Sequence, residues 1–159
     1  MDRSTHRDIV RILDSGRDLT LATLRADGWP QATTVSYVND GLSIYIGCSA
    51  RSQKAANMAR DGRVSLTVTL PYDDWDQIQG VSLGGQAARV TDPDHMLAIG
   101  GLFLEKFPQV SQAFKADDEG ELALFCVTPR VISLLDYRKG FGHTTLVTAE
   151  ALEAMLAPA

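Results

Sequence analysis

Residues 44–68 read IYIGCSARSQKAANMARDGRVSLTV, and the interpretation of the whole chain starts from this stretch. It begins with a run typical of a β-strand and continues into a short polar loop. Ser52 is placed to cap a helix that continues to Arg60, and Asp61-Gly62 is a typical helix end. A second strand is expected at residues 63–70, where apolar and polar residues alternate. The stretch therefore predicts a strand, a loop, a helix and a second strand in succession.

The start of this helix has the chemistry of a phosphate-binding site. A helix N-terminus presents free backbone N–H groups and the positive end of the helix dipole. Ser52 adds a hydroxyl, while Arg51 and Lys54 add positive charge. The alternative is structural: Ser52 is only a helix cap and Lys54 only a solvated side chain, and the spacing alone slightly favours this. A lysine is unfavourable in a first helical turn, however, which supports the binding interpretation.

The residues before this stretch predict a short helix and antiparallel strands. The helix spans residues 5–15 and places three apolar side chains on one face at helical spacing. Two segments rich in β-branched residues follow, joined by an Asp-Gly hairpin signal, and an Asn-Asp-Gly turn leads to a third. We therefore expect an antiparallel meander of three strands, at residues 19–25, 31–38 and 42–49.

Three further strands and three further helices are expected after residue 70. Gly84-Gly85 lies inside one strand and indicates a bulge or bend, the feature by which a sheet curls into a barrel. Asp92-Pro93 is a typical helix start. Pro129-Arg130 interrupts the last apolar segment, so we predict two strands there. The expected strands are 81–90, 121–129 and 131–138, and the expected helices are 93–106, 108–115 and 150–156.

Seven short strands and few helices predict a mainly β protein built as a barrel. The chain has 159 residues, which fits one domain of ordinary size, and no repeat or linker divides it. We therefore expect a single domain over residues 1–159. A net charge of −5 argues against broad nucleic-acid binding, and no apolar run is long enough to cross a membrane. The N-terminus lacks the features of a secretory signal, so a cytoplasmic location is expected.

No metal site is expected from the sequence. Cys48 and Cys126 match no metal-ligand spacing and lie in apolar surroundings, where a cysteine is usually a small buried hydrophobic residue. Asp73, Asp74 and Asp76 share one loop but lack the glycine and the ligand spacing of a calcium site. We therefore expect two free thiols and a solvated acidic loop.

Residues 52–55 (Ser-Gln-Lys-Ala) and 63–66 (Arg-Val-Ser-Leu), with the helix between them, resemble the flavin mononucleotide (FMN) motif of the pyridoxamine 5′-phosphate oxidase family. The resemblance covers most of the chain and includes residues 30–37, residues 85–90 and the ending LLDYRKGFGHTTLV. It implies an FMN-binding split β-barrel of six to seven antiparallel strands. It also implies a homodimer with FMN bound between the two subunits.

The resemblance implies which residues bind FMN. In that family the phosphate is held at the helix start and the ring edge by the backbone of the second and third strands, which tunes the flavin. Either Gln77 or Gln79 is expected to approach the cofactor from the partner subunit. The remaining residues implied are Gln31, Ala32, Thr33, Thr34, Val35, Ser36, Gly47, Cys48, Ser49, Ser52, Gln53 and Lys54, and the charge of Arg51 adds it to the expected cofactor-binding residues.

The sequence also departs from the oxidase that gives the family its name. Gln53 stands where that enzyme has an arginine, so one phosphate-binding charge is missing unless Arg51 supplies it. The long N-terminal extension of the oxidase does not occur in this sequence. Its C-terminal signature of tryptophan, arginine and histidine, which holds the vitamin B6 substrate, is missing too. We therefore do not expect the oxidation of pyridoxamine phosphate.

The three histidines differ in their surroundings. His6 and His95 lie on expected helices without a partner at ligand spacing, which favours a surface role. His143 follows Gly140-Phe141-Gly142, where glycines allow close backbone approach to a flavin or a substrate. A flexible turn after the last strand explains the same residues equally well.

The sequence thus predicts an FMN-binding oxidoreductase that transfers electrons or a hydride between a reduced nicotinamide and a small acceptor. Two alternatives stay open. Related barrels hold a deazaflavin or haem, and a haem enzyme would use His143 or His6 as its axial ligand. The second alternative is a flavin-binding or sensing module without a substrate. The sequence specifies no catalytic residue.

Overall fold

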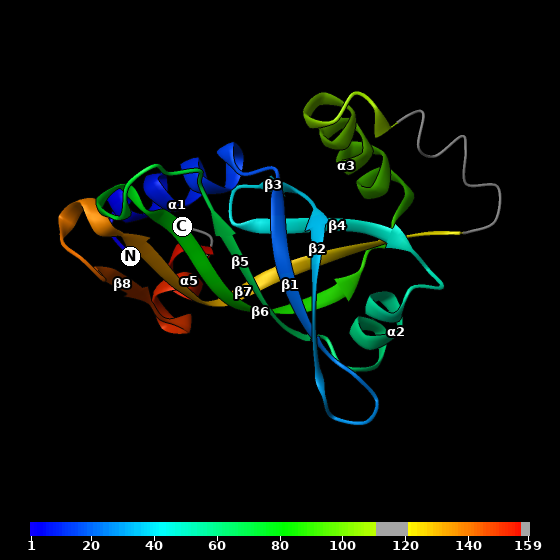
Figure 1. Cartoon of the computed structure of the whole chain (residues 1–159). Helices are drawn as coiled ribbons and strands as arrows, with labels where there is room; N and C mark the ends of the chain where they lie inside the picture. Colours follow the sequence, from blue (N-terminus) through cyan, green and yellow to red (C-terminus); the bar gives the residue numbers. More distant parts are fainter. Residues whose placement is uncertain (111–120, 157–159) are drawn as a thin grey trace.

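The computed structural model describes residues 1–110 and 121–156, which contain eight antiparallel strands in one curled sheet (Figure 1). The strands are β1 (Asp18–Leu24), β2 (Pro30–Ser36), β3 (Val38–Asp40), β4 (Ser43–Ser49), β5 (Arg63–Thr69), β6 (Gln79–Arg89), β7 (Leu122–Asp136) and β8 (Thr144–Val147). The helices are α1 (Arg3–Ser15), α2 (Gln53–Arg60), α3 (Pro93–Lys106) and α5 (Ala149–Leu156), with short 3-10 turns η1 (Trp75–Gln77) and η2 (Tyr137–Lys139). The mainly β split-barrel class is therefore confirmed.

Tyr37 joins the two ends of the sheet. The strand order is β2-β1-β5-β6-β7-β4-β3, with β8 paired to β7, so β2 and β3 are at opposite ends although only this residue separates them in sequence. A sheet whose two ends are joined by one residue has to curl. Our prediction of one strand over residues 31–38 within a three-stranded meander was wrong, because β4 pairs with β3 and β7 instead of β2. The Tyr37 side chain is fully buried and marks the point where the chain passes from one end of the sheet to the other.

The last apolar segment forms one 15-residue strand, β7, so the prediction of two strands was also wrong. Pro129 has no N–H to donate, and an interior strand normally excludes it. Here β7 pairs with β4 up to Val127 and with β8 only from Ile132, so Pro129 lies in the gap between these two neighbours. On its other side the register shifts between Gly84 and Gly85, which confirms the bulge predicted at that glycine pair.

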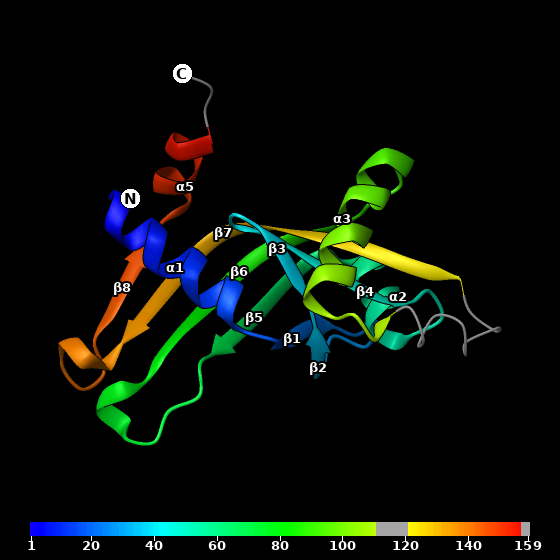
Figure 2. The same ribbon diagram turned by 90° about the horizontal axis from the view of Figure 1, so that it is seen from above.

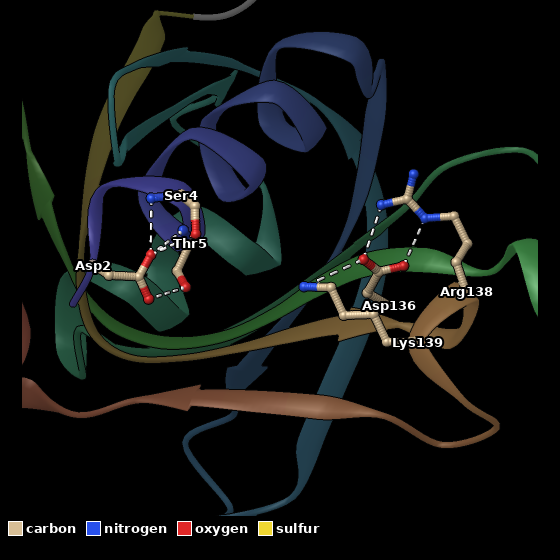
Figure 3. A network of polar contacts seen from close by, with 6 residues as sticks. All are labelled: Asp2, Ser4, Thr5, Asp136, Arg138 and Lys139. Carbon is tan, nitrogen blue, oxygen red and sulfur yellow. Dashed lines mark hydrogen bonds and ion pairs between the residues drawn. The ribbon is translucent and has the colours of Figure 1, made fainter.

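The helix starts follow the capping signals in the sequence. The side chains of Asp2, Ser52 and Asp92 accept backbone N–H groups at the starts of α1, α2 and α3. Figure 3 shows the Asp2 cap, in which one carboxylate oxygen accepts from the N–H groups of Ser4 and Thr5 at 2.8 Å each. Strand β8 was not predicted, and the helix expected at residues 108–115 falls mainly outside the described residues.

Two hydrophobic clusters hold these elements together. The main core lies inside the curled sheet, where α1 contributes the fully buried Ile9, Ile12 and Leu13. The second cluster attaches α3 to β3, β4 and β7, and it includes Tyr45 and Ile99. Burying one such aliphatic side chain stabilises a fold by about 1.5–3 kcal/mol, so both clusters matter for stability. No helix within the described residues is long and apolar enough to cross a membrane.

Candidate functional site

A cavity of about 810 Å³ lies between α2, α3 and the strands β2, β4 and β7. Its volume falls within the range of about 300–1,000 Å³ that is usual for small-molecule sites. Figure 2 shows α3 and α2 at the same end of the molecule, away from β8 and α5. Seven of the residues proposed from the sequence line it: Val35, Ser36, Gly47, Cys48, Ser49, Ser52 and Lys54.

Ser52 organises the start of α2 at one end of the cavity. Its hydroxyl donates to the carbonyl of Ser49 at 2.7 Å and accepts the N–H of Ala55 at 3.3 Å. The backbone N–H groups of Gln53 and Lys54, at the first two helical positions, have no acceptor within the helix. An anion at this point would therefore meet two free N–H donors and the positive end of the helix dipole.

Lys54 is the only charged side chain among the described residues that line the cavity. It is partly buried, and no acidic residue lies in the first turn of α2. Arg51 is exposed in the loop before the helix and does not line the cavity. The Lys54 end of the cavity is therefore electrostatically suited to bind one anionic group.

Strand β2 presents an unpaired edge beside the cavity. Within the described residues its only partner strand is β1, so the outward N–H and C=O groups of its other edge are free of sheet pairing. Side chains of β2 that point inward, at Gln31, Thr33 and Val35, are only partly buried. The Thr33 hydroxyl is buried without a hydrogen-bond partner in the described part of the chain. Buried hydroxyls usually have a partner, so this strand has unused hydrogen-bonding capacity.

A buried amide network holds α2 against β1 and β2. The fully buried Asn57 donates to Thr23 at 3.0 Å and to Gln31 at 3.1 Å, and its amide oxygen accepts from Gln53 at 2.9 Å. Two residues proposed as cofactor ligands, Gln31 and Gln53, therefore use their side chains to position the helix. Asn57 itself was missed, although an asparagine inside a short amphipathic helix is a sequence signal for such a contact.

Helix α3 forms the other wall, which the sequence interpretation missed. Leu97 and Leu104 line the cavity but remain 78% and 51% exposed. Gly100 and Gly101 line it between them, and a Cβ atom added to either glycine would meet no atom within 4 Å. Each glycine inside a helix costs about 1 kcal/mol relative to alanine. A helix with apolar residues on all sides and a central Gly-Gly pair was the available sequence signal for a ligand-facing wall.

Gln77, Gln79 and His143 lie at the other end of the barrel. Helix α2 ends beside Ala87, whose N–H donates to Gly62, while Gln79 lies eight residues away along β6. At about 3.3 Å per residue the separation is about 25 Å. His143 belongs to the same distant end, because its carbonyl accepts the N–H of Asp136, the register partner of Gln79. None of the three lines the cavity of its own chain.

That distant end carries a polar network and an exposed aromatic group. The nearly buried Asp136 accepts two hydrogen bonds from Arg138 at 2.7 and 2.9 Å and lies 3.7 Å from the Lys139 amine (Figure 3). These hydrogen bonds hold the pKa of Asp136 below its usual range. Trp75 and Phe141 stack with their ring centres 5.9 Å apart and are 68% and 78% exposed.

Comparison with known proteins identifies the family. The family model described as pyridoxamine 5′-phosphate oxidase matches residues 6–136, which include every strand but β8. The chain belongs to the pyridoxamine 5′-phosphate oxidase family. This confirms the resemblance seen in the sequence. No curated protein matches the chain.

Several solved structures share this fold. A haem-binding protein from Mycobacterium smegmatis is 24% identical with a TM-score of 0.79, covering 97% of this chain but only 62% of its own. A conserved hypothetical protein from Mycobacterium tuberculosis is 29% identical, with a TM-score of 0.73 and 95% of both chains covered. An FAD-binding protein from Mesorhizobium loti is 17% identical, with a TM-score of 0.63, covering 84% of this chain and 94% of its own. Members of this fold thus include proteins described as binding haem and FAD.

The residues around the cavity fit the FMN that the pyridoxamine 5′-phosphate oxidase family implies. Lys54 and the free N–H groups of α2 suit a phosphate, and the unpaired edge of β2 suits the polar edge of a flavin ring. The Thr33 hydroxyl on the same strand is buried without a hydrogen-bond partner in the described residues, but Thr33 does not line the cavity. No group of three or more potential metal ligands occurs in the described residues, and Cys48 and Cys126 are free thiols.

Proposed function

We propose that this protein is an FMN-dependent oxidoreductase that works as a homodimer. Its FMN binds at the subunit interface, with the phosphate at the start of α2 and the ring along the free edge of β2. Electrons or a hydride pass from a reduced nicotinamide to a small acceptor by way of the flavin, which supplies the redox chemistry. The residues of the chain bind and orient the cofactor.

One observation carries this proposal: a single cavity brings together Lys54, the N-terminus of α2 and the free edge of β2. An anion site next to unpaired backbone donors matches the two chemically different halves of FMN. A simple helix cap would explain Ser52 but would leave the 810 Å³ space beside it without a role.

The homodimer is supported by the residues at the distant end of the barrel. The family resemblance implies that either Gln77 or Gln79 approaches the flavin, and because both lie about 25 Å from the cavity end of their own chain, this would require a second subunit. Trp75 and Phe141 form an exposed stacked pair at that same end. Exposed aromatic residues of this kind are enriched at protein interfaces.

The first experiment is an absorption spectrum of protein purified without added cofactor, with mass spectrometry of the molecule released on denaturation. Flavin bands and released FMN are expected. A Soret band or a released deazaflavin would replace FMN in the proposal, and a colourless protein that does not take up FMN would refute it. Oxidation of NAD(P)H no faster than with free FMN would instead favour the sensing module.

The phosphate assignment is tested with Lys54→Ala. This variant is expected to bind FMN at least tenfold more weakly, because it removes the only cation of the described lining. Arg3→Ala is the matched control, since Arg3 is exposed on α1 and its loss changes the net charge equally. The quenching of FMN fluorescence on binding gives the dissociation constant of each variant. Equal FMN affinities in the two variants would remove Lys54 from the site.

Haem is the second candidate cofactor, favoured by the apolar wall that α3 gives the cavity. The haem hypothesis requires an axial ligand, and His6, His95 and His143 are not among the described residues that line the cavity. A haem protein would show a Soret band that one histidine substitution shifts or removes. The same purified sample therefore separates the two cofactors.

A further inference from the structure

The cavity is divided chemically into two halves. The half formed by β2, β4 and α2 contains Ser36, Ser49, Ser52 and Lys54, and it holds every hydroxyl and the charge of the described lining. The half formed by α3, the following residues 107–110 and β7 is apolar in its described lining, with one exception, the neutral amide of Gln109. Its apolar members are Met96, Leu97, Ile99, Phe103, Leu104, Phe107, Val110, Leu122 and Leu124. FMN has its polar groups at the phosphate, the ribityl chain and the ring edge, so the polar half accounts for them.

The apolar half is open and has room next to α3. Leu97 and Leu104 stay largely exposed, and the helix between them carries Gly100 and Gly101 without side chains. Glycine at such a position allows a flat molecule to approach the helix backbone closely. Any large side chain there would close this space.

We infer that the α3 half of the cavity binds the electron acceptor, and that this acceptor is a planar, uncharged, apolar molecule with a ring carbonyl. This inference rests on the proposed FMN function and specifies its substrate class. An anionic acceptor would find no cation among the described residues of this half, and a sugar or carboxylate would lose its hydration there with few compensating hydrogen bonds. Within the described lining of this half, the Gln109 amide is the polar side chain that can donate a hydrogen bond to a carbonyl oxygen.

A quinone satisfies these requirements and serves as the probe. In the overall reaction the nicotinamide gives one hydride, one proton comes from water, and the quinone becomes a hydroquinone. The quinone gains two electrons and two protons, NAD(P)H becomes NAD(P)⁺, and the flavin returns to its starting state. No further oxidant or reductant is required.

The test compares 1,4-naphthoquinone with 1,4-naphthoquinone-2-sulfonate, which has the same rings and one negative charge. Calorimetry on the FMN-loaded protein measures their dissociation constants, and NADPH oxidation measures kcat/KM for each. The neutral quinone is expected to bind at least tenfold more tightly. Gly100→Leu is expected to weaken its binding at least tenfold while FMN stays bound.

Ala98→Leu is the matched control, because Ala98 is exposed on the same helix but does not line the cavity. It is expected to leave quinone binding unchanged. Leu104→Lys is expected to reverse the preference by giving the apolar half a cation for the sulfonate. Leucine is a better helix former than glycine, and leucine, lysine and alanine all have high helix propensity, so none of the variants should break α3; circular dichroism checks that each variant folds.

The outcomes separate the acceptor from the cofactor. Bound FMN with equal affinity for both quinones, or with no effect of Gly100→Leu, would overturn the acceptor assignment and leave the flavin proposal intact. Protein that does not bind FMN would refute the proposed function, and the acceptor assignment would be lost with it. Bound FMN, a tenfold preference for the neutral quinone and its loss only in Gly100→Leu would establish the acceptor site.

Discussion

The hydroxyl of Tyr37 donates a 2.7 Å hydrogen bond to the carbonyl of Leu13, and so the residue that joins the two sheet ends is fixed to the last turn of α1. The Lys106 amine lies 4.1 Å from the centre of the same ring. This one side chain therefore connects α1, the strand crossover and the end of α3.

Tyr37→Phe should lower the free energy of unfolding by about 1–2 kcal/mol, because a buried hydrogen bond is lost while the ring packing is kept. Tyr72→Phe is the control, since Tyr72 is 46% exposed, and it should change the value by less than about 0.5 kcal/mol. Urea denaturation measures both. A Tyr37→Phe variant as stable as the wild type would show that the bond adds no net stability.

Asn57→Ala should destabilise the protein by about 2–3 kcal/mol and also weaken FMN binding. It removes the group that satisfies Thr23, Gln31 and Gln53, and α2 loses its attachment to β1 and β2. Asn39→Ala, which breaks a more exposed contact with Asp14, should cost less and leave FMN binding unchanged. If Asn57→Ala lost stability but kept full FMN affinity, α2 would not depend on the network for its position.

The protein should lose stability above about pH 10. Burial raises the pKa of Tyr45 to about 12 and also raises the pKa of Tyr37. In the unfolded chain a tyrosine loses its proton near pH 10, while in the folded protein these two keep theirs. The unfolded state then binds fewer protons, so the free energy of unfolding falls as pH rises through this window.

Tyr45→Phe tests this origin of the alkaline instability. Its free energy of unfolding should decline less steeply between about pH 10 and 12, by up to about 1.4 kcal/mol for each pH unit. Urea titrations of the wild type and the variant across this range give the two slopes. Identical slopes would assign the alkaline loss to other groups.

Asp136→Asn should cost about 1–2 kcal/mol at neutral pH, because it removes the negative charge and one of the two oxygens that accept hydrogen bonds from Arg138. The pKa of Asp136 is lowered in the folded protein, so its contribution is present above about pH 4 and is lost as pH falls through the folded value. The variant should thus approach the wild type in acid. Glu153→Gln, from an exposed pair with Arg130, is the control and should have little effect at any pH.

Gly85→Ala should destabilise the barrel by about 1–3 kcal/mol. The new Cβ would lie 2.7 Å from the Thr128 carbonyl oxygen and 2.9 Å from a Val127 methyl, so the bulge would have to shift. Gly101→Ala has open space around it and should raise stability by up to about 1 kcal/mol. Thermal unfolding of both variants checks the contrast, and a stable Gly85→Ala protein would mean that the bulge adapts easily.

Local signals in the sequence predicted most elements, because caps and turns depend on residues close together in the chain. Ser52, Asp92 and the Gly84-Gly85 pair are such signals, and each acts as expected. The failures concern pairing between distant segments. Nothing within residues 31–38 tells that Tyr37 is the crossover, because its burial depends on α1 and on the closure of the whole sheet.

The sequence predicted the α2 side of the candidate site, because a local motif marks that side. Ser52 and Lys54 are two residues apart in sequence, and both line the cavity. The α3 wall was missed because its residues look like an ordinary apolar helix until the fold leaves Leu97 and Leu104 uncovered. Asn57 was missed for a related reason, since its partners Thr23 and Gln31 lie 34 and 26 residues away.

The bulge in β7 bends the barrel without changing which side chains of the strand are buried. Gly84 pairs with Val131 and Gly85 with Pro129, so Arg130 is a residue with no counterpart on β6. Buried residues of β7 are odd-numbered from 123 to 129 and even-numbered from 132 onward, apart from Leu124 against α3. Deleting Arg130 would make the alternation continuous without turning any buried side chain outward. Evolution could therefore straighten or bend this barrel by gaining or losing one residue, with the amino acids of the core unchanged.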